Sequence, residues 1–180
     1  IPSMKPFQFT NDTDDIWVMN VDGSGAANLT PDVGSAVIFD RVPEWSPDAA
    51  RIAFISNRTG VTRLWMMNAD GSSPVQVVPS SIEAVENFPA WSPDGAWIAF
   101  LSNTEADGFA IGIARPNGDD YRTWPGEGSD VGRLVWMAED RILYSAFDGT
   151  DYEIFALDPE TGAGSNVADH AAHDFRAYAL

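Results

Sequence analysis

Cysteine is absent from the 180-residue sequence, and cationic side chains are scarce, with one lysine and nine scattered arginines. The lack of cysteine excludes disulfide frameworks, thiol nucleophiles and cysteine-based zinc sites. No apolar run approaches the roughly 18 residues of a membrane-spanning helix, and no amphipathic pattern of helical length is present. Without clustered cations, neither nucleic acid nor insertion at an anionic membrane is an expected interaction.

Acidic residues dominate the charge that is present. The chain has 27 Asp and Glu against 10 Lys and Arg, which gives a formal net charge of −17. Hydrophobic residues make up 44% of the sequence and aromatic residues 12%, too much for a disordered chain. This length fits one folded domain. We therefore predict a single domain over residues 1–180 whose acidic surface favours basic partners or divalent cations.

A repeat organises the sequence. Residues 43–56 read PEWSPDAARIAFIS, and residues 89–102 read PAWSPDGAWIAFLS. A degenerate copy, LVWMAEDRILYSA, begins at Leu134 and lacks the Ser-Pro-Asp turn. The second half of the unit recurs four times: DIWVMNVDGSG from Asp15, RLWMMNADGSS from Arg63, AIGIARPNGDD from Ala110 and EIFALDPETGA from Glu153.

Each unit predicts four short antiparallel strands separated by Gly, Asp, Asn, Ser and Pro. In the second unit we expect them near 42–46, 51–56, 63–68 and 74–79. A four-stranded unit repeated every 40 to 50 residues or so is typical of a β-propeller blade. We expect tryptophans to pack between blades and aspartates to form turns. The tryptophans are Trp17, Trp45, Trp65, Trp91 and Trp136, and the aspartates are Asp22, Asp48, Asp70 and Asp94.

The predicted fold class is therefore all-β, a propeller of about four four-stranded blades. The segment PFQFTN from Pro6 matches IAFISN from Ile52, so the first blade begins at its second strand. We predict a partial blade at 1–31, which residues 169–180 could complete, and blades at 42–80, 88–125 and 131–168. Three arrangements remain open: a closed four-bladed ring, a fragment of a larger propeller, and a half-ring completed by a second chain.

The two Trp-Ser-Pro-Asp strings, with the apolar strand and Asp-Gly turn that follow them, resemble the TolB-like (WD40-like) propeller repeat. This resemblance implies a periplasmic or extracellular bacterial protein, and it is specific over residues 11–30 and 43–103. Proteins similar to TolB carry six such blades. Related blades form the propeller domains of prolyl-oligopeptidase-like hydrolases, so the resemblance indicates architecture better than activity.

The sequence offers no catalytic constellation. The only histidines, His170 and His173, lie three residues apart, so on a strand they would point to opposite faces and could not share a metal ion. No G-x-S-x-G elbow accompanies them. The acidic run at 12–15 lacks the glycine and distal glutamate of an EF-hand loop. We predict no enzyme activity, no metal site and no cofactor in this chain, with calcium in a central channel as the open alternative.

Loops offer the best candidate site, because links between second and third strands and links between blades emerge on one face of a propeller. The candidate partner-binding residues on these links are Asp12, Asp14, Asp15, Phe39, Asp40, Arg58, Glu105, Asp107, Asp148 and Asp151. We predict a non-enzymatic binding or scaffolding module that recognises a protein, peptide or glycan through this acidic face. The alternatives are a gating domain of a larger hydrolase and a self-assembling structural subunit.

Overall fold

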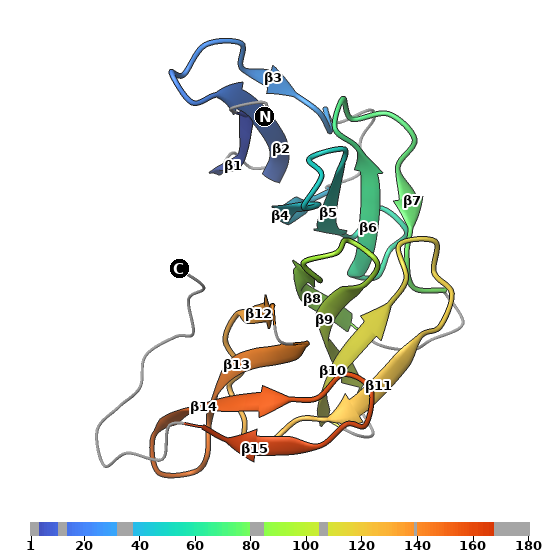
Figure 1. The fold of residues 1–180 in the computed structure, drawn as a ribbon. Coiled ribbons are helices and arrows are strands. Elements are labelled where there is room, and N and C mark those ends of the chain that lie inside the picture. The colour runs from blue at the N-terminus through green and yellow to red at the C-terminus, as the bar shows by residue number, and fades with distance from the viewer. Residues whose placement is uncertain are drawn as a thin grey trace.

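The computed structural model describes residues 4–10, 14–31, 38–79, 85–104, 108–138 and 140–167. Within these ranges the chain is entirely β, with 15 strands in four antiparallel sheets. The sheets follow one another along an arc (Figure 1). No helix long and apolar enough to cross a membrane occurs in the described part of the chain.

Each sheet is formed by strands that are consecutive in sequence. The first sheet contains β1 (Met4–Thr10), β2 (Asp14–Asn20) and β3 (Ala27–Asn28). The second contains β4 (Asp40–Trp45), β5 (Arg51–Ser56), β6 (Arg63–Asn68) and β7 (Val75–Gln76). The third contains β8 (Val85–Trp91), β9 (Ile98–Thr104), β10 (Gly108–Ala114) and β11 (Arg122–Pro125). The fourth contains β12 (Leu134–Met137), β13 (Arg141–Phe147), β14 (Tyr152–Leu157) and β15 (Gly164–Asn166).

These sheets confirm the predicted all-β propeller architecture. In the second unit, β5 and β6 have the predicted bounds, β4 begins two residues before the predicted 42, and β7 is shorter than predicted. The first strand of each of the last three sheets is its inner strand. These inner strands, β4, β8 and β12, contact one another in succession along the arc. The division of the chain into blades stays a prediction, and the proposed closing strand at 169–180 lies outside the described residues.

The turns follow from local hydrogen bonding. The hydroxyl of Ser46 donates to Asp48 over 2.6 Å, and that carboxylate also accepts the amide of Ala50. The second copy of the motif repeats this arrangement with Ser92 and Asp94. These hydrogen bonds to side chains satisfy backbone N–H groups in the turns, which do not pair with a neighbouring strand. The predicted turn role of these aspartates is confirmed, and Asp22 and Asp70 act in the same way in the outer turns.

The core consists of three clusters, each shared by two adjacent sheets. On β5, Ile52 and Phe54 pack toward the first sheet, whereas Ala53 and Ile55 pack toward the third. Side chains alternate along a strand, so this central strand is buried on both faces and its sequence is almost continuously apolar. A single sheet could not bury both faces alone, which explains why the units occur in tandem.

Four of the five predicted tryptophans pack between sheets, and for Trp17 the packing stays a prediction. Trp91 and Trp136 are 7% and 9% exposed and belong to two of the clusters. Trp45 and Trp65 are half-buried against the third cluster, between the first and second sheets. The aromatic residues of the repeat therefore hold neighbouring sheets together.

The first sheet starts with a strand equivalent to β5, as the sequence predicts, but the expected alignment is wrong by one residue. The sequence match equates Pro6 with Ile52. In the structure, Pro6 pairs with Val18 of β2. Val18 corresponds in the repeat to Met66 of β6, which pairs with Ala53. Pro6 therefore corresponds to Ala53. Register is set by strand pairing, and a slip of one residue exchanges the two faces of a strand.

Candidate partner-binding face

Two links of the fourth sheet meet at one end of the fold. The link between β13 and β14 carries Asp148 and Asp151, and the link between β11 and β12 carries Asp130. A β-bridge between Ser129 and Phe147 joins them, with hydrogen bonds of 2.7 and 2.6 Å. Both links are of the two kinds expected to emerge on one face of a propeller.

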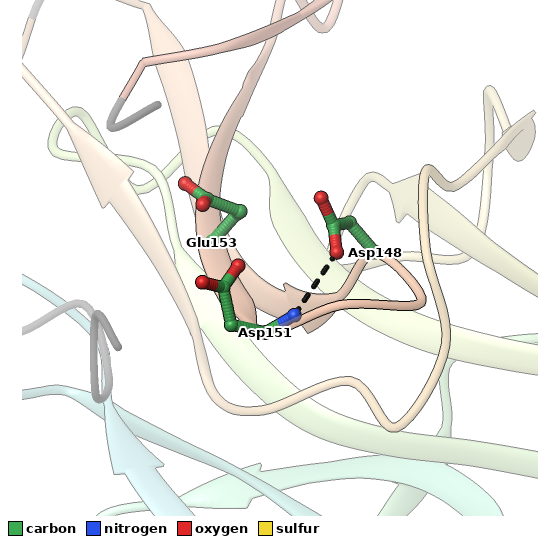
Figure 2. Close-up of side chains that lie close together, drawn as sticks. All are labelled: Asp148, Asp151 and Glu153. Carbon is green, nitrogen blue, oxygen red and sulfur yellow. Dashed lines mark hydrogen bonds between the residues drawn. The ribbon is translucent and has the colours of Figure 1, made fainter. Parts of the chain in front are cut away.

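Asp148 shapes its own loop. Its carboxylate accepts the amide of Thr150 over 2.7 Å. It also accepts the amide of Asp151 over 3.1 Å, the bond drawn in Figure 2. These two amides favour the ionised carboxylate and hold the pKa of Asp148 below its ordinary value. Asp148 is exposed, so it presents a fixed negative charge to solvent.

Asp148, Asp151 and Glu153 bring their carboxyl groups together. One oxygen of each lies within 4.8 Å of the others, and Figure 2 shows the three side chains grouped beside the strand. Glu153 is 3% exposed, whereas Asp151 is half-buried. Carboxylate oxygens at such spacing suit a basic group or a hard divalent cation. Ca²⁺ takes about 6–8 oxygen ligands, more than the three carboxyl groups here supply with one oxygen each.

Asp130 extends the same acidic surface. The hydroxyl of Tyr152 donates to its carboxylate, and this bond raises the pKa of Tyr152 because a phenolate would lie against a negative charge. Among the described residues, no cationic group lies within 4.0 Å of Asp130, Asp148 or Asp151. We call Asp130, Asp148, Asp151 and Glu153 the fourth-sheet acidic cluster.

The acidic residues expected on the first sheet are arranged differently. Asp14 and Asp15 begin β2 rather than lying in the preceding link, so their expected loop position is wrong. Asp14 is 7% exposed and forms an ion pair with Arg41. Asp15 accepts a 2.7 Å hydrogen bond from the side-chain amide of Asn28. Strand pairing has drawn these carboxylates into the sheet.

Asp40 and Arg58 lie close together, as expected of one face, but they pair with each other. Asp40 is only 2% exposed and accepts hydrogen bonds of 2.9 and 3.0 Å from Arg58. Phe39 is half-buried beneath the guanidinium of Arg41, whose Cζ atom lies 4.4 Å from the ring centroid. The charges of Asp40 and Arg58 therefore neutralise each other.

Three further candidates, Asp12, Glu105 and Asp107, lie outside the described residues. Glu153 and Tyr152 were not among the residues predicted for the site, because both lie on a strand in an otherwise apolar segment. Only their positions beside the acidic links reveal them. An acidic residue in the middle of an apolar strand was the available signal, because a charged group is costly to bury and such positions are uncommon.

Comparisons with known proteins address the fold. No protein-family model and no curated protein sequence matches the chain. Among solved structures, TolB from Acinetobacter baumannii superposes with a TM-score of 0.76 at 15% identity, over 92% of this chain and 41% of that one. The chain has the fold of a TolB-like β-propeller. At 15% identity, this structural similarity shows the fold of the chain and does not show its activity.

Other structures share the TolB-like architecture within larger proteins. Puromycin hydrolase gives a TM-score of 0.71 at 16% identity, over 97% of this chain and 28% of that one. A chain of the nidogen/laminin complex gives 0.67 at 11% identity, over 92% of this chain and 60% of that one. The chain thus spans less than two thirds of the length of each of these proteins. The described sheets match part of each of these larger structures.

Proposed function

We propose that these TolB-like blades form a non-enzymatic binding or scaffolding module, which recognises a basic protein, peptide or glycan through the fourth-sheet acidic cluster. The observation that carries this proposal is the contrast between sheets. Asp14 and Asp40 are paired with arginines, whereas Asp130, Asp148 and Asp151 have no cationic neighbour in the described residues. Carboxylates on a loop surface that have no paired cation attract positively charged partners.

The preorganised loop adds to this attraction. Backbone amides hold Asp148 ionised, and the bridge between Ser129 and Phe147 fixes the two links relative to each other. A partner that supplies lysine, arginine or an amino sugar would therefore meet carboxylates whose positions are already set, which reduces the ordering cost of binding. The net charge of −17 would speed the encounter at low salt.

The nidogen/laminin complex supports protein recognition by this architecture. The likeness to TolB supports a location outside the cytoplasm, in the periplasm or the extracellular space. Fractionation of cells that produce the protein at its native level tests this location, and recovery in the cytoplasm would contradict it.

A fluorescent Lys/Arg-rich decapeptide provides a direct test of the acidic surface. The triple variant Asp130→Asn, Asp148→Asn, Asp151→Asn should weaken its binding about tenfold at low salt, because three charges leave the surface. The amide oxygen of asparagine can still accept the loop hydrogen bonds, so the fold should persist. Affinity of the unmodified chain should also fall as salt is raised.

The matched control removes three charges elsewhere. Asp22, Asp70 and Asp94 are exposed turn residues, and their replacement by asparagine keeps the turn bonds. If this control weakens the decapeptide as much as the cluster variant does, net charge alone explains binding and the proposed surface is wrong.

A second candidate function is a gating or positioning domain of a larger hydrolase. Puromycin hydrolase contains a region of the same architecture that matches 97% of this chain. On this alternative the blades act beside a separate catalytic domain. A peptidase assay on the complete gene product, with a short prolyl peptide as substrate, tests it, and activity lost on replacing a serine outside these 180 residues would support it.

A further inference from the structure

A groove lies between the third and fourth sheets and has a volume of about 380 Å³, within the range of about 300–1,000 Å³ that is usual for small-molecule sites. Both sheets contribute to its lining. Asp140, on this groove, directly precedes β13, whereas Asp148 of the fourth-sheet acidic cluster directly follows the same strand. The groove and the acidic cluster are therefore separate places, at the two ends of β13.

The third unit departs from the second at positions that line this groove. Trp97 takes the place of Arg51, immediately before the Ile-Ala-Phe segment, and Arg122 occupies a position that is apolar in the second unit. Arg51 covers the tryptophan of the following sheet, with its Cζ atom 5.1 Å from the ring centroid of Trp91. In the third unit no arginine stands at this position to cover Trp136, so the junction with the fourth sheet lacks this contact.

Arginine side chains gather around Trp97 on the third-sheet side of the groove. The Cζ atoms of Arg115 and Arg122 lie 4.3 and 5.4 Å from its ring centroid. Arg115 donates to Asp120 over 2.9 Å. Arg122 is exposed, and among the described residues no carboxylate lies within 4.0 Å of its guanidinium. Its planar set of N–H donors is therefore open to a carboxylate.

Acidic side chains line the fourth-sheet side. Asp140 and Glu160 are exposed, and neither forms an ion pair within the described part of the chain. A further carboxylate of the lining, Asp94, is held in its own turn by a 2.6 Å hydrogen bond from Ser92. Opposite charges therefore line the two sides of the groove, too far apart for an ion pair between the sheets.

Apolar side chains complete the lining. Ile113 and Trp136 both border the groove and are 2% and 9% exposed. The Nε1 atom of Trp136 is buried without an acceptor among the described residues, whereas its counterpart Trp91 donates to the backbone carbonyl of Glu44 over 3.1 Å. The junction of the third and fourth sheets therefore has polar groups that the described part of the chain does not satisfy.

We propose that this groove binds a small zwitterion in which an ammonium group and a carboxylate end a short aliphatic chain, as in a free ω-amino acid or a C-terminal lysine. Arg122 binds the carboxylate, Asp140 and Glu160 bind the ammonium group, and the methylene groups lie over Ile113 and Trp136. A ligand with a single charge would leave one side of the groove without a counterion, so the zwitterion is favoured over either half of it. This site is independent of the proposed function.

The zwitterion ε-aminocaproate tests the groove together with n-hexylamine and caproate, which each lack one of its charged groups. Isothermal titration calorimetry on the full 180-residue chain should show saturable binding of ε-aminocaproate, at least about tenfold tighter than that of either analogue. The indole N–H resonance of Trp97 should shift on binding, whereas that of Trp91, at the other junction, should not. The fourth-sheet acidic cluster would bind n-hexylamine as well as ε-aminocaproate, so preference for the zwitterion distinguishes the groove from that cluster.

Two variants assign each charged group of the ligand to one side of the groove. Arg122→Gln should weaken ε-aminocaproate about tenfold and leave n-hexylamine no weaker, since the amine has no carboxylate to lose a partner. Asp140→Asn with Glu160→Gln should weaken ε-aminocaproate by a similar factor and leave caproate no weaker. The matched control, Asp22→Asn with Asp70→Asn, also removes two exposed carboxylates and should leave the affinity for ε-aminocaproate unchanged.

A peptide that ends in lysine, with its C-terminus free or amidated, identifies the source of the zwitterion. Tighter binding of the free form than of ε-aminocaproate, lost on amidation, would indicate a C-terminal lysine. Weaker binding of the free form would indicate a free ω-amino acid.

Three results would overturn the proposal. The first is the absence of saturable binding of ε-aminocaproate. The second is an equal affinity for ε-aminocaproate and for either analogue. The third is an equal weakening of n-hexylamine and ε-aminocaproate by Arg122→Gln, which would mean that the substitution does not act through the carboxylate.

Discussion

Arg58 donates from one nitrogen, Nη2, to both carboxylate oxygens of Asp40, over 2.9 and 3.0 Å. The same guanidinium lies over Trp65, with Cζ 4.8 Å from the ring centroid. Asp40 is 2% exposed, so Arg58→Ala leaves a buried carboxylate without its cation. We expect a loss of about 3 kcal/mol in the free energy of unfolding, measured by urea denaturation.

An exposed pair provides the control for Arg58→Ala. The side chains of Arg115 and Asp120 are 43% and 48% exposed and lie 2.9 Å apart. Solvent screens such a pair, so Asp120→Asn, which leaves the stacking of Arg115 on Trp97 in place, should cost less than about 1 kcal/mol. Similar losses for the two substitutions would show that burial does not decide the value of these ion pairs.

Ala49 and Gly95 occupy the same position in the two Ser-Pro-Asp turns, with φ of 56° and 70°. An L-residue with a Cβ atom is strained in this region, whereas glycine is not. Ala49→Gly should therefore raise the free energy of unfolding by about 0.5 kcal/mol, and Gly95→Ala should lower it by a similar amount. Thermal and urea unfolding of the two single variants check both signs, and equal signs would contradict this explanation.

Gly118 adopts a φ of 86° and lies against the preceding sheet. A Cβ atom at this position would stand 2.5 Å from the backbone oxygen of Val77. Gly118→Ala should therefore cost about 3 kcal/mol, since it adds a backbone clash to the strain of positive φ. Gly60 is the matched control, with a φ of 91° and no atom within 4 Å of a built Cβ.

Gly60→Ala should cost only about 1 kcal/mol, the conformational part of the penalty. The difference between the two glycine variants in urea denaturation measures the contact between the Asn117-Gly118 turn and the neighbouring sheet. Equal costs would mean that the second and third sheets can move apart at this contact.

The Ser-Pro-Asp turns should govern part of the acid sensitivity. Hydrogen bonds from Ser46 and from the amide of Ala50 lower the pKa of Asp48, and those from Ser92 and an amide lower the pKa of Asp94. A carboxyl whose pKa is lower in the folded state stabilises the fold above its unfolded value, about 3.9, and this contribution disappears as the pH falls through the lowered pKa. The double variant Asp48→Asn, Asp94→Asn should therefore lose less stability below about pH 4 than the parent.

Glu44 should behave in the opposite sense. Burial raises its pKa, against the opposing effect of Arg133. Its contribution is therefore complete below the unfolded value of about 4.3 and is lost as the pH rises through the raised pKa. Glu44→Gln should therefore reduce the loss of stability as the pH rises above about 4.3, measured by urea midpoints from about pH 3 to about pH 7. A change in the same direction as the aspartate variant would refute this assignment.

The repeat made the architecture readable from the sequence. The tandem Trp-Ser-Pro-Asp motif predicts turn, strand and stacking position together, because each of these depends on residues close in the chain. The strands β5 and β6 and the turn bonds of Asp48 and Asp94 were therefore predictable. The one-residue error at Pro6 arose where the match was short and strand pairing had to decide the register.

The candidate site was predictable only in part. Asp148 and Asp151 lie on the expected link, but Asp40 is buried against Arg58, 18 residues away in sequence. Glu153 joins the acidic cluster from a strand. Which carboxylates stay uncompensated depends on side chains brought together by sheet packing, and local sequence does not contain that information.

The sequence alone determined the type of unit, its turns and the aromatic residues that hold neighbouring units together, because periodic burial and turn chemistry act over a few residues. Tertiary structure decided which charges are paired. This outcome depends on distances between segments far apart in the chain, as between Asp40 and Arg58 or between Asp14 and Arg41.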